Sequence, residues 1–443
     1  MDFVCSTVIA WEALRESGGD MRIPAVGSRG VVATLAVVLC LAGCAGSGSA
    51  PQPTPTATAT ATAAPTDTFT PAPVATASAT ATAQPTATTT PTVSPTATAT
   101  IDASADPRYA GAGPYPVGYT TIDLADRKAA VFYPAIPGSQ VGKPLATYDQ
   151  SEPLPDAIRN LLKNYDLTFT MTAYNDLPAA TDGPFPLLLF SHGYAGWRLV
   201  NSRLLAGIAS WGFVVAAPDH LERGLLAVAT NTAMPSTAKD IEVLLATRDA
   251  VGAPTGTAAA LLTGLTDLGR TAVSGHSAGG GAALAMLDQS VIDAVVGYAA
   301  AGTPAEVPQG KPTLLIAGSD DLVVPPATND MLYGELLPPK RALIIDRAGH
   351  NSFTDSCIAI RNGTDLVGIV MEIGLPIPSD LLVLATNGCE PDNLDPELAL
   401  TIIQHFTVAH LRAAFGIDAP AVGLGNGIAT AFDGVMLTYQ FEN

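Results

Sequence analysis

Apolar runs of strand length recur between residues 186 and 350 and alternate with longer stretches of helical period. A strand that is apolar on nearly every residue must be covered on both faces, as in a parallel sheet flanked by helices. The runs are PLLLFSHG, GFVVAAPDH, RTAVSGHS, DAVVGYAAAG, PTLLIAGSDD and RALIIDRAGH, and helices are expected at residues 199–211, 238–250, 278–287, 327–336 and 396–415. The pattern therefore predicts an α/β fold with a mostly parallel central sheet and helices on both faces.

This folded domain is expected at residues 106–443, because the residues before it cannot build a core. It opens with a pair of strands in YPVGYTTIDL and AAVFYPA. Residues 44–105 are almost wholly Thr, Ala, Pro and Ser, a composition too poor in large apolar groups to offset the entropy of folding. We expect a disordered stalk that acts as a semi-rigid tether, and its hydroxyls are candidates for sugar attachment.

The first 43 residues have the layout of a leader that is removed. Arg22 and Arg29 precede the apolar run GVVATLAVVLCLAG, which is typical of a secretory signal and too short for a spanning helix. Met21 is therefore a candidate for the true start. The run ends in LAGC, which resembles the lipobox of bacterial lipoproteins and implies that Cys44 becomes the lipidated first residue. The alternative is an ordinary signal peptide with a chance cysteine. Either way the domain is expected outside the cytoplasm, and with the lipobox it is anchored to the cell membrane.

The formal net charge of −19 excludes a nucleic-acid partner, since phosphate binding requires a basic face. The His, Cys and Asp spacings match neither H-E-x-x-H nor paired C-x-x-C motifs, so no metal or organic cofactor is expected. Of five cysteines, only Cys357 and Cys389 belong to the folded part. In an oxidising compartment we expect a disulfide between them, the alternative being two separate buried thiols.

The stretch SGHSAGGGAAL contains Ser277 between an apolar strand and an alanine-rich helix. This pentapeptide GHSAG in its strand-to-helix context resembles the nucleophile elbow of the α/β-hydrolases. A serine nucleophile needs a histidine base and a carboxylate that orients it, in the family order serine, acid, histidine. The next strand ends carry Asp320 and Asp321 and then His350, so the order matches. The rivals of His350 are His220, His405 and His410, for which we expect structural or surface roles.

Backbone N–H groups must also stabilise the oxyanion of the tetrahedral intermediate. The resemblance implies that Ala278, the residue after the nucleophile, supplies one donor. The segment SHGYAG resembles the His-Gly-x loop that supplies the other, which would be the N–H of Tyr194. Tyr194, Trp197 and His276 are further expected to contact the substrate, although Trp197 is equally suited to core packing.

Over residues 114–415 the chain resembles a bacterial group of α/β-hydrolases. This group is related to platelet-activating-factor acetylhydrolase of the isoform II type, dienelactone hydrolase and the polyester hydrolases. In the polyester hydrolases the acid is followed by two or three residues and Val-Pro or Ala-Pro, so DLVVPP implies Asp321 as the acid, with Asp320 as the alternative. Two features depart from these relatives. His276 and Ala278 replace an aromatic residue and Met beside the nucleophile, and position 277 is Ser where dienelactone hydrolases have Cys.

The resemblance implies a monomeric serine hydrolase that cleaves a small-molecule or polymeric carboxylic ester through an acyl-enzyme. One alternative is a polyester or cutin-type depolymerase. An alternative of a different class is a non-catalytic surface-binding module, which would predict a degraded site. Apolar residues at helical spacing between 158 and 167 predict either a cap over the acyl pocket or a surface insertion.

Overall fold

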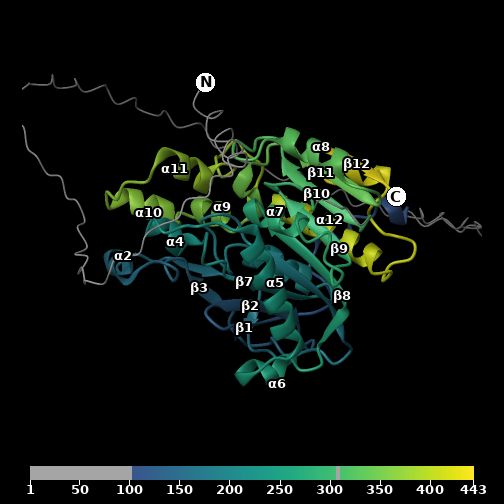
Figure 1. Cartoon of the computed structure of the whole chain (residues 1–443), viewed down its shortest axis with the longest axis horizontal. Helices are drawn as coiled ribbons and strands as arrows, with labels where there is room; N and C mark the ends of the chain where they lie inside the picture. Colours follow the sequence, from purple (N-terminus) through teal and green to yellow (C-terminus); the bar gives the residue numbers. More distant parts are fainter. Residues whose placement is uncertain (1–101, 306–309) are drawn as a thin grey trace, which may run out of the picture. The chain divides into compact units, whose positions relative to one another are not determined.

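The structure is a computed structural model that describes residues 102–305 and 310–443 (Figure 1). The expected leader, the Cys44 anchor and nearly all of the expected stalk lie outside these residues. The described chain begins with the 3₁₀ turn η1 (Ala103–Ala105), just before the boundary expected at residue 106. The backbone oxygens of Ala103 and Ser104 accept hydrogen bonds from the N–H groups of Gly423 (2.9 Å) and Gly425 (2.7 Å). Among the described helices, none combines the length and apolarity needed to cross a membrane.

A ten-stranded mixed sheet forms the centre of the described chain, in the order β12-β11-β10-β9-β8-β6-β7-β2-β1-β5. The strands β7, β6, β8, β9, β10 and β11 run parallel, β2 is antiparallel to both β7 and β1, and β12 is antiparallel to β11. Their bounds are β1 (Val117–Asp123), β2 (Lys128–Pro134), β5 (Tyr174–Asn175), β6 (Phe185–Ser191), β7 (Val214–Pro218), β8 (Thr266–His276), β9 (Ala294–Tyr298), β10 (Thr313–Gly318), β11 (Lys340–Ile345) and β12 (Leu437–Glu442). A separate pair, β3 (Thr147–Asp149) and β4 (Thr168–Thr170), is antiparallel.

Helices cover both faces of this sheet because successive strand residues point to opposite sides. Ala130 and Phe132 of β2 belong to a core shared with α3 and α12, whereas Ala129 and Val131 pack in a second core with α5, α7 and α8. The helices are α2 (Asp156–Leu162), α3 (Ser202–Ala209), α4 (Leu225–Ala229), α5 (Thr237–Gly252), α6 (Ala259–Leu262), α7 (Ala278–Leu284), α8 (Pro326–Glu335), α9 (Ser356–Arg361), α10 (Leu366–Glu372), α11 (Ser379–Thr386) and α12 (Pro396–Ala414). Burial on both faces explains why β6, β7, β9 and β10 read as continuous apolar runs.

This architecture confirms the α/β-hydrolase fold that the sequence predicts. In such sheets the working site lies beyond the carboxyl ends of the parallel strands, and the loops after β6, β8, β10 and β11 all leave from those ends. The elements that were not expected include the helices α10 and α11 and the edge strand β12, which continues the sheet beyond β11.

Candidate active site

Ser277 occupies a sharp turn between β8 and α7. Its backbone has φ 57° and ψ −121°, a conformation that costs energy for a residue with a side chain and that is found at functional turns. A Cβ on Gly275 would lie 2.1 Å from the oxygen of Gly279, and a Cβ on Gly279 would lie 2.0 Å from the oxygen of Ser191. Both positions therefore require glycine, and the glycine-rich stretch is a tightly packed turn that presents Ser277.

His350 and Asp321 form a buried pair at the ends of the neighbouring strands β11 and β10. The Nδ1 atom of His350 lies 2.9 Å from Oδ2 of Asp321. The other carboxylate oxygen of Asp321 accepts from the backbone N–H groups of Val323 (2.8 Å) and Val324 (2.7 Å), which fixes the carboxylate in the turn DLVVPP. A carboxylate that only accepts places the imidazole proton on Nδ1, so Nε2 is the atom left to act as a base.

The two aspartates have different surroundings. Asp320 is exposed, and its carboxylate accepts from the hydroxyl of Ser319 (2.8 Å) and the side-chain amide of Asn393 (3.3 Å). It therefore lies in a surface network, whereas Asp321 contacts His350.

The three rival histidines are buried away from this pair. Burial lowers the pKa of His220 and His405 to about 4 and that of His410 to about 3, so each is neutral. None of the three is among the described residues that line the cavity next to Ser277.

Ser277 and His350 line one cavity of about 660 Å³ together with Tyr194, Trp197 and His276. The Nε2 atom of His350 is buried and has no hydrogen-bond partner among the described residues. The structure thus brings the expected nucleophile, base and acid to one place, with the unpaired base nitrogen on a ring that borders the cavity.

The expected oxyanion donors come from two turns beside Ser277. Ala278 is the first residue of α7, so its N–H has no acceptor within the helix. Tyr194 lies in the loop that follows β6 and is among the residues that line the cavity. A Cβ on its neighbour Gly193 would lie 3.3 Å from Cβ of Ser277, which shows how closely this loop packs against the nucleophile.

His276 and Trp197 line the cavity, but each also packs inside the protein. His276 Nε2 lies 2.9 Å from the backbone oxygen of His350 and donates to it, and the two rings are 4.7 Å apart. Burial holds the pKa of His276 well below its ordinary value, so it is a neutral donor. Trp197 is buried and packs edge-on against Tyr148 at 5.3 Å. His276 therefore supports the His350 turn in addition to forming part of the wall.

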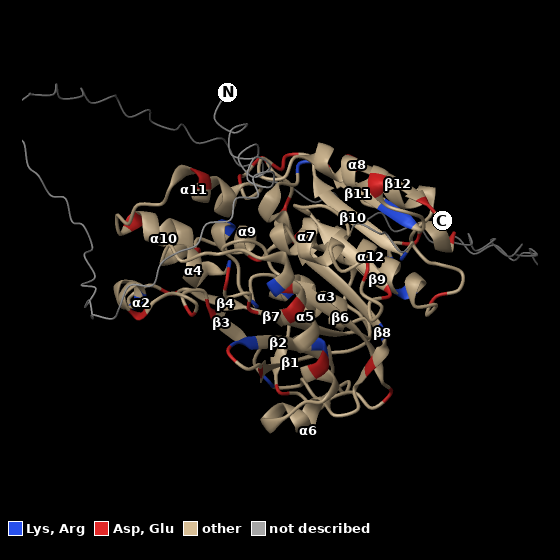
Figure 2. Ribbon diagram, in the orientation of Figure 1, with Lys and Arg blue, Asp and Glu red and all other residues tan. Residues whose placement is uncertain are grey.

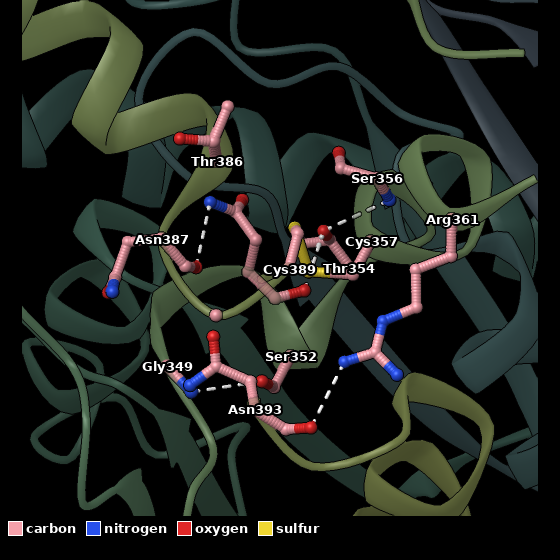
Figure 3. Close-up of a disulfide and its surroundings, with 12 residues drawn as sticks. Gly349, Ser352, Thr354, Ser356, Cys357, Arg361, Thr386, Asn387, Cys389 and Asn393 are labelled. Atoms are coloured by element: carbon pink, nitrogen blue, oxygen red, sulfur yellow. Dashed lines mark hydrogen bonds between the residues drawn. A yellow bond between two sulfur atoms is a disulfide. The ribbon is translucent and has the colours of Figure 1, made fainter. Parts of the chain in front are cut away.

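Asn387 joins the acid and base turns, a role that the sequence analysis missed. Its side-chain oxygen accepts from the N–H of His350 and of Leu322, each at 3.0 Å, and its amide donates to the oxygen of Asp320 at 3.0 Å. Figure 3 shows Asn387 two residues before Cys389, next to the disulfide. The bridge expected between Cys357 and Cys389 is present, with Cα atoms 4.6 Å apart. Proximity to Cys389 was the one available sequence signal.

Helices from separate parts of the chain form the far wall of the cavity. The cap segment, residues 366–386 with α10 and α11, lies between the two bridged cysteines. Val370 and Leu381 of this segment line the cavity together with Ile158 of α2 and Leu225 of α4. Of the two interpretations left open for residues 158–167, the structure favours the cap, because Ile158 faces the site. Figure 2 shows that α10 and α11 carry few charges.

Within residues 102–305 and 310–443, no group of three or more His, Cys, Asp or Glu side chains is placed so that it could bind a metal ion.

Residues 177–306 match the model of the Chlorophyllase family. The matched range contains Tyr194 and Ser277 and stops before Asp321 and His350. A solved structure, ferulic acid esterase from Streptomyces cinnamoneus, aligns with a TM-score of 0.48 and 20% identity, covering 68% of this chain and 89% of that chain. The family match supports an ester hydrolase of the α/β-hydrolase superfamily. It does not single out the narrower group related to platelet-activating-factor acetylhydrolase.

Proposed function

We propose that the protein is a serine hydrolase that cleaves carboxylic esters through an acyl-enzyme. Ser277 attacks the carbonyl carbon, His350 takes the hydroxyl proton and returns it to the leaving alcohol, and Asp321 orients His350. The N–H groups of Tyr194 and Ala278 stabilise the oxyanion. One observation carries this proposal. His350 lies 2.9 Å from Asp321, and the same His350 lines one cavity together with Ser277.

The similarity of residues 177–306 to the Chlorophyllase family supports the same reaction class. A non-catalytic binding module would not need the Ser277 turn, the buried pair of Asp321 and His350 and the two N–H donors together. That alternative therefore has no observation in its favour.

The walls of the cavity favour a neutral ester with a large apolar part. No Lys or Arg is among the described residues that line it, so no cation is available there for a substrate carboxylate or phosphate. Its far wall is aliphatic and comes from α2, α4 and the cap segment. A covered cavity of this size suits one ester molecule of moderate size better than the surface of an insoluble polymer.

The triad is tested with variants that keep the fold. Ser277→Ala should abolish hydrolysis of nitrophenyl esters and labelling by a fluorophosphonate probe. Asp321→Asn should lower kcat by a factor on the order of 10³ to 10⁴, because the wrong imidazole tautomer is favoured. Asp320→Asn is the matched control and should cost little. Clear activity in purified Ser277→Ala protein would overturn the mechanism, and the reverse ranking of the aspartates would move the acid to Asp320.

The same assay, run on acyl chains of increasing length, tests the substrate class. Each buried methylene contributes about 0.8 kcal/mol, so kcat/KM should rise roughly fourfold per methylene until the cavity is full. Release of soluble products from a polyester film faster than from these esters would favour the depolymerase.

We also propose that the enzyme is exported and held at the membrane by a lipid on Cys44, a residue outside those described. The support is the LAGC sequence after an apolar run and the Thr/Ala/Pro/Ser stalk that follows it. The native chain should fractionate with membranes and Cys44→Ser should not yield a processed, membrane-bound protein. Finding that processed variant at the membrane would refute the anchor.

A further inference from the structure

Arg223 is an almost fully buried arginine, 1% exposed, in the loop after β7. Its Nε donates to the carboxylate of Asp240 on α5, at 3.0 Å from Oδ2 and 3.2 Å from Oδ1. A buried guanidinium without further partners would be costly, so the remaining N–H groups must be accounted for.

Those groups hold the loop that carries the candidate oxyanion donor. Nη2 donates to Oγ of Ser191 at 2.8 Å, and Nη1 donates to the backbone oxygens of His192 and of Gly193, the latter at 2.9 Å. The oxygen of Gly193 also accepts from Nδ1 of His192 at 2.8 Å and from the N–H of Gly196 at 3.1 Å. Three donors thus converge on one carbonyl.

The Gly193 carbonyl belongs to the same peptide group as the N–H of Tyr194. This peptide is trans, and in a planar trans peptide the C=O and N–H bonds point in opposite directions. Fixing the oxygen therefore fixes the direction of the Tyr194 N–H, which has no acceptor among the described residues. A cationic donor on the oxygen also polarises the peptide and strengthens its N–H as a donor.

We infer that Arg223 is a positioning residue for the oxyanion hole, acting through the Gly193–Tyr194 peptide. This inference rests on the proposed ester hydrolysis and deepens it, because it identifies what holds the second donor in place before substrate arrives. Pre-oriented donors stabilise a developing oxyanion without reorganisation during the reaction, which is the source of their catalytic effect.

The groups around Arg223 show which of the buried side chains carry a charge. Asp240 Oδ1 lies 2.8 Å from Nδ1 of His220, and Nε2 of His220 lies 2.9 Å from Oγ of Ser191. Burial lowers the pKa of His220 to about 4 and that of His192 well below its ordinary value, so both rings are neutral. Arg223 and Asp240 are thus the charged pair. The chain Asp240–His220–Ser191 has the atom order of a catalytic triad, but Ser191 is fully buried and no substrate reaches it.

The test compares Arg223→Met with Arg127→Met in the full-length enzyme. Arg127 is a matched control, because its side chain is also buried and ion-paired, at 2.9 Å from Glu222, and it makes no bond to residues 191–196. Turnover is expressed per active site titrated with a fluorophosphonate, so that loss of folded protein is removed from the comparison. The second readout is inhibition by an aryl boronic acid, whose tetrahedral adduct places an oxygen in the oxyanion hole.

Arg223→Met should lower kcat by a factor of roughly 10² with KM little changed, and should weaken boronic-acid inhibition by a similar factor. Arg127→Met should leave both values near those of the wild type while lowering Tm. Arg223→Lys keeps the charge beside Asp240, but its ammonium cannot hold all four partners, so a smaller loss of kcat is expected even if the Met variant fails to fold. Unchanged kcat and inhibition per titrated site in either folded Arg223 variant would overturn the inference. An inactive wild type would instead contradict the proposed function.

Discussion

Asp355 is a buried carboxyl, 1% exposed, in the turn that follows His350. Its oxygens accept from the N–H of Arg203 at 3.2 Å, the hydroxyl of Tyr148 at 3.2 Å and the hydroxyl of Ser202, so it serves as the cap of α3 in place of Asn201. Burial raises the pKa of Asp355 to about 7, above its ordinary value of 3.8. The carboxyl is therefore protonated in the folded enzyme over much of the acidic range.

Because the pKa of Asp355 is raised, we expect this aspartate to make the protein less stable as pH rises, the reverse of the usual effect of an aspartate. Between about pH 4 and pH 7 the folded state keeps the proton and the unfolded state loses it, so the free energy of unfolding falls as pH rises across this window. A difference of about three pKa units corresponds to a few kcal/mol. Asp355→Asn removes this contribution, so its stability relative to the wild type should increase from pH 4 to pH 7. Urea unfolding of both proteins at several pH values measures the difference, and parallel curves would contradict it.

At the scale of elements, the disulfide closes the segment that contains α9, α10 and α11 onto the turn that carries the base. The bridged residues are 32 positions apart, and for a loop of that size the chain-entropy estimate is roughly 3 to 4 kcal/mol. Because Asn387 holds the N–H of His350 and lies beside Cys389, the bridge also restrains the triad.

Cys357→Ser should lower the free energy of unfolding by about that amount and should also lower kcat at temperatures where the protein stays folded. The second effect follows because a base displaced by about 1 Å can lose roughly a hundredfold in rate. Reduction of the wild type in a parallel assay should reproduce both effects without a mutation. If kcat is unchanged in folded, reduced enzyme, the bridge contributes to stability alone.

The helices and strands that could be predicted are those whose own residues show the full hydrophobic pattern of a helix or a buried strand. The six parallel strands were read from their apolar runs, and α5, for example, extends over Thr237–Gly252 where residues 238–250 were expected. The helices of the cap segment are short and have few polar residues, and Gly374, Pro376 and Pro378 interrupt their pattern, so their sequence indicates neither a helix nor a strand. Strand β12 alternates correctly, but its partner β11 lies about ninety residues upstream and no local signal reports that pairing.

The candidate site divides in the same way. Ser277 and His350 could be predicted because each follows a strand in the order that the chemistry requires. The same order left Asp320 and Asp321 open, and only the resemblance of DLVVPP to the polyester hydrolases pointed to Asp321. Arg223 and Asn387 were not, because a single arginine in HLERGLL or an asparagine in ATNGC reads as a surface residue until the fold shows what surrounds it. His276 was expected to touch substrate, and its bond to the oxygen of His350 depends on a turn 74 positions away.

At the scale of the whole molecule, the two ends of the described chain depend on each other. The side chain of Gln404 on α12 donates to the backbone oxygens of Tyr109 and Gly111, each at 2.7 Å, across 295 and 293 positions of sequence. The hydroxyl of Tyr109 donates to the carboxylate of Asp418, and the η1 turn bonds to Gly423 and Gly425.

The first part of the domain to be synthesised therefore meets its partners last. The long-range hydrogen bonds of Ala103, Ser104 and Tyr109 all come from residues 404–425, and contacts so distant in sequence form slowly. In a nascent chain that stops before residue 404, strands β1 to β11 are complete but Ala103, Ser104 and Tyr109 lack these bonds. We therefore expect a protease to cleave such a chain first near residues 102–111.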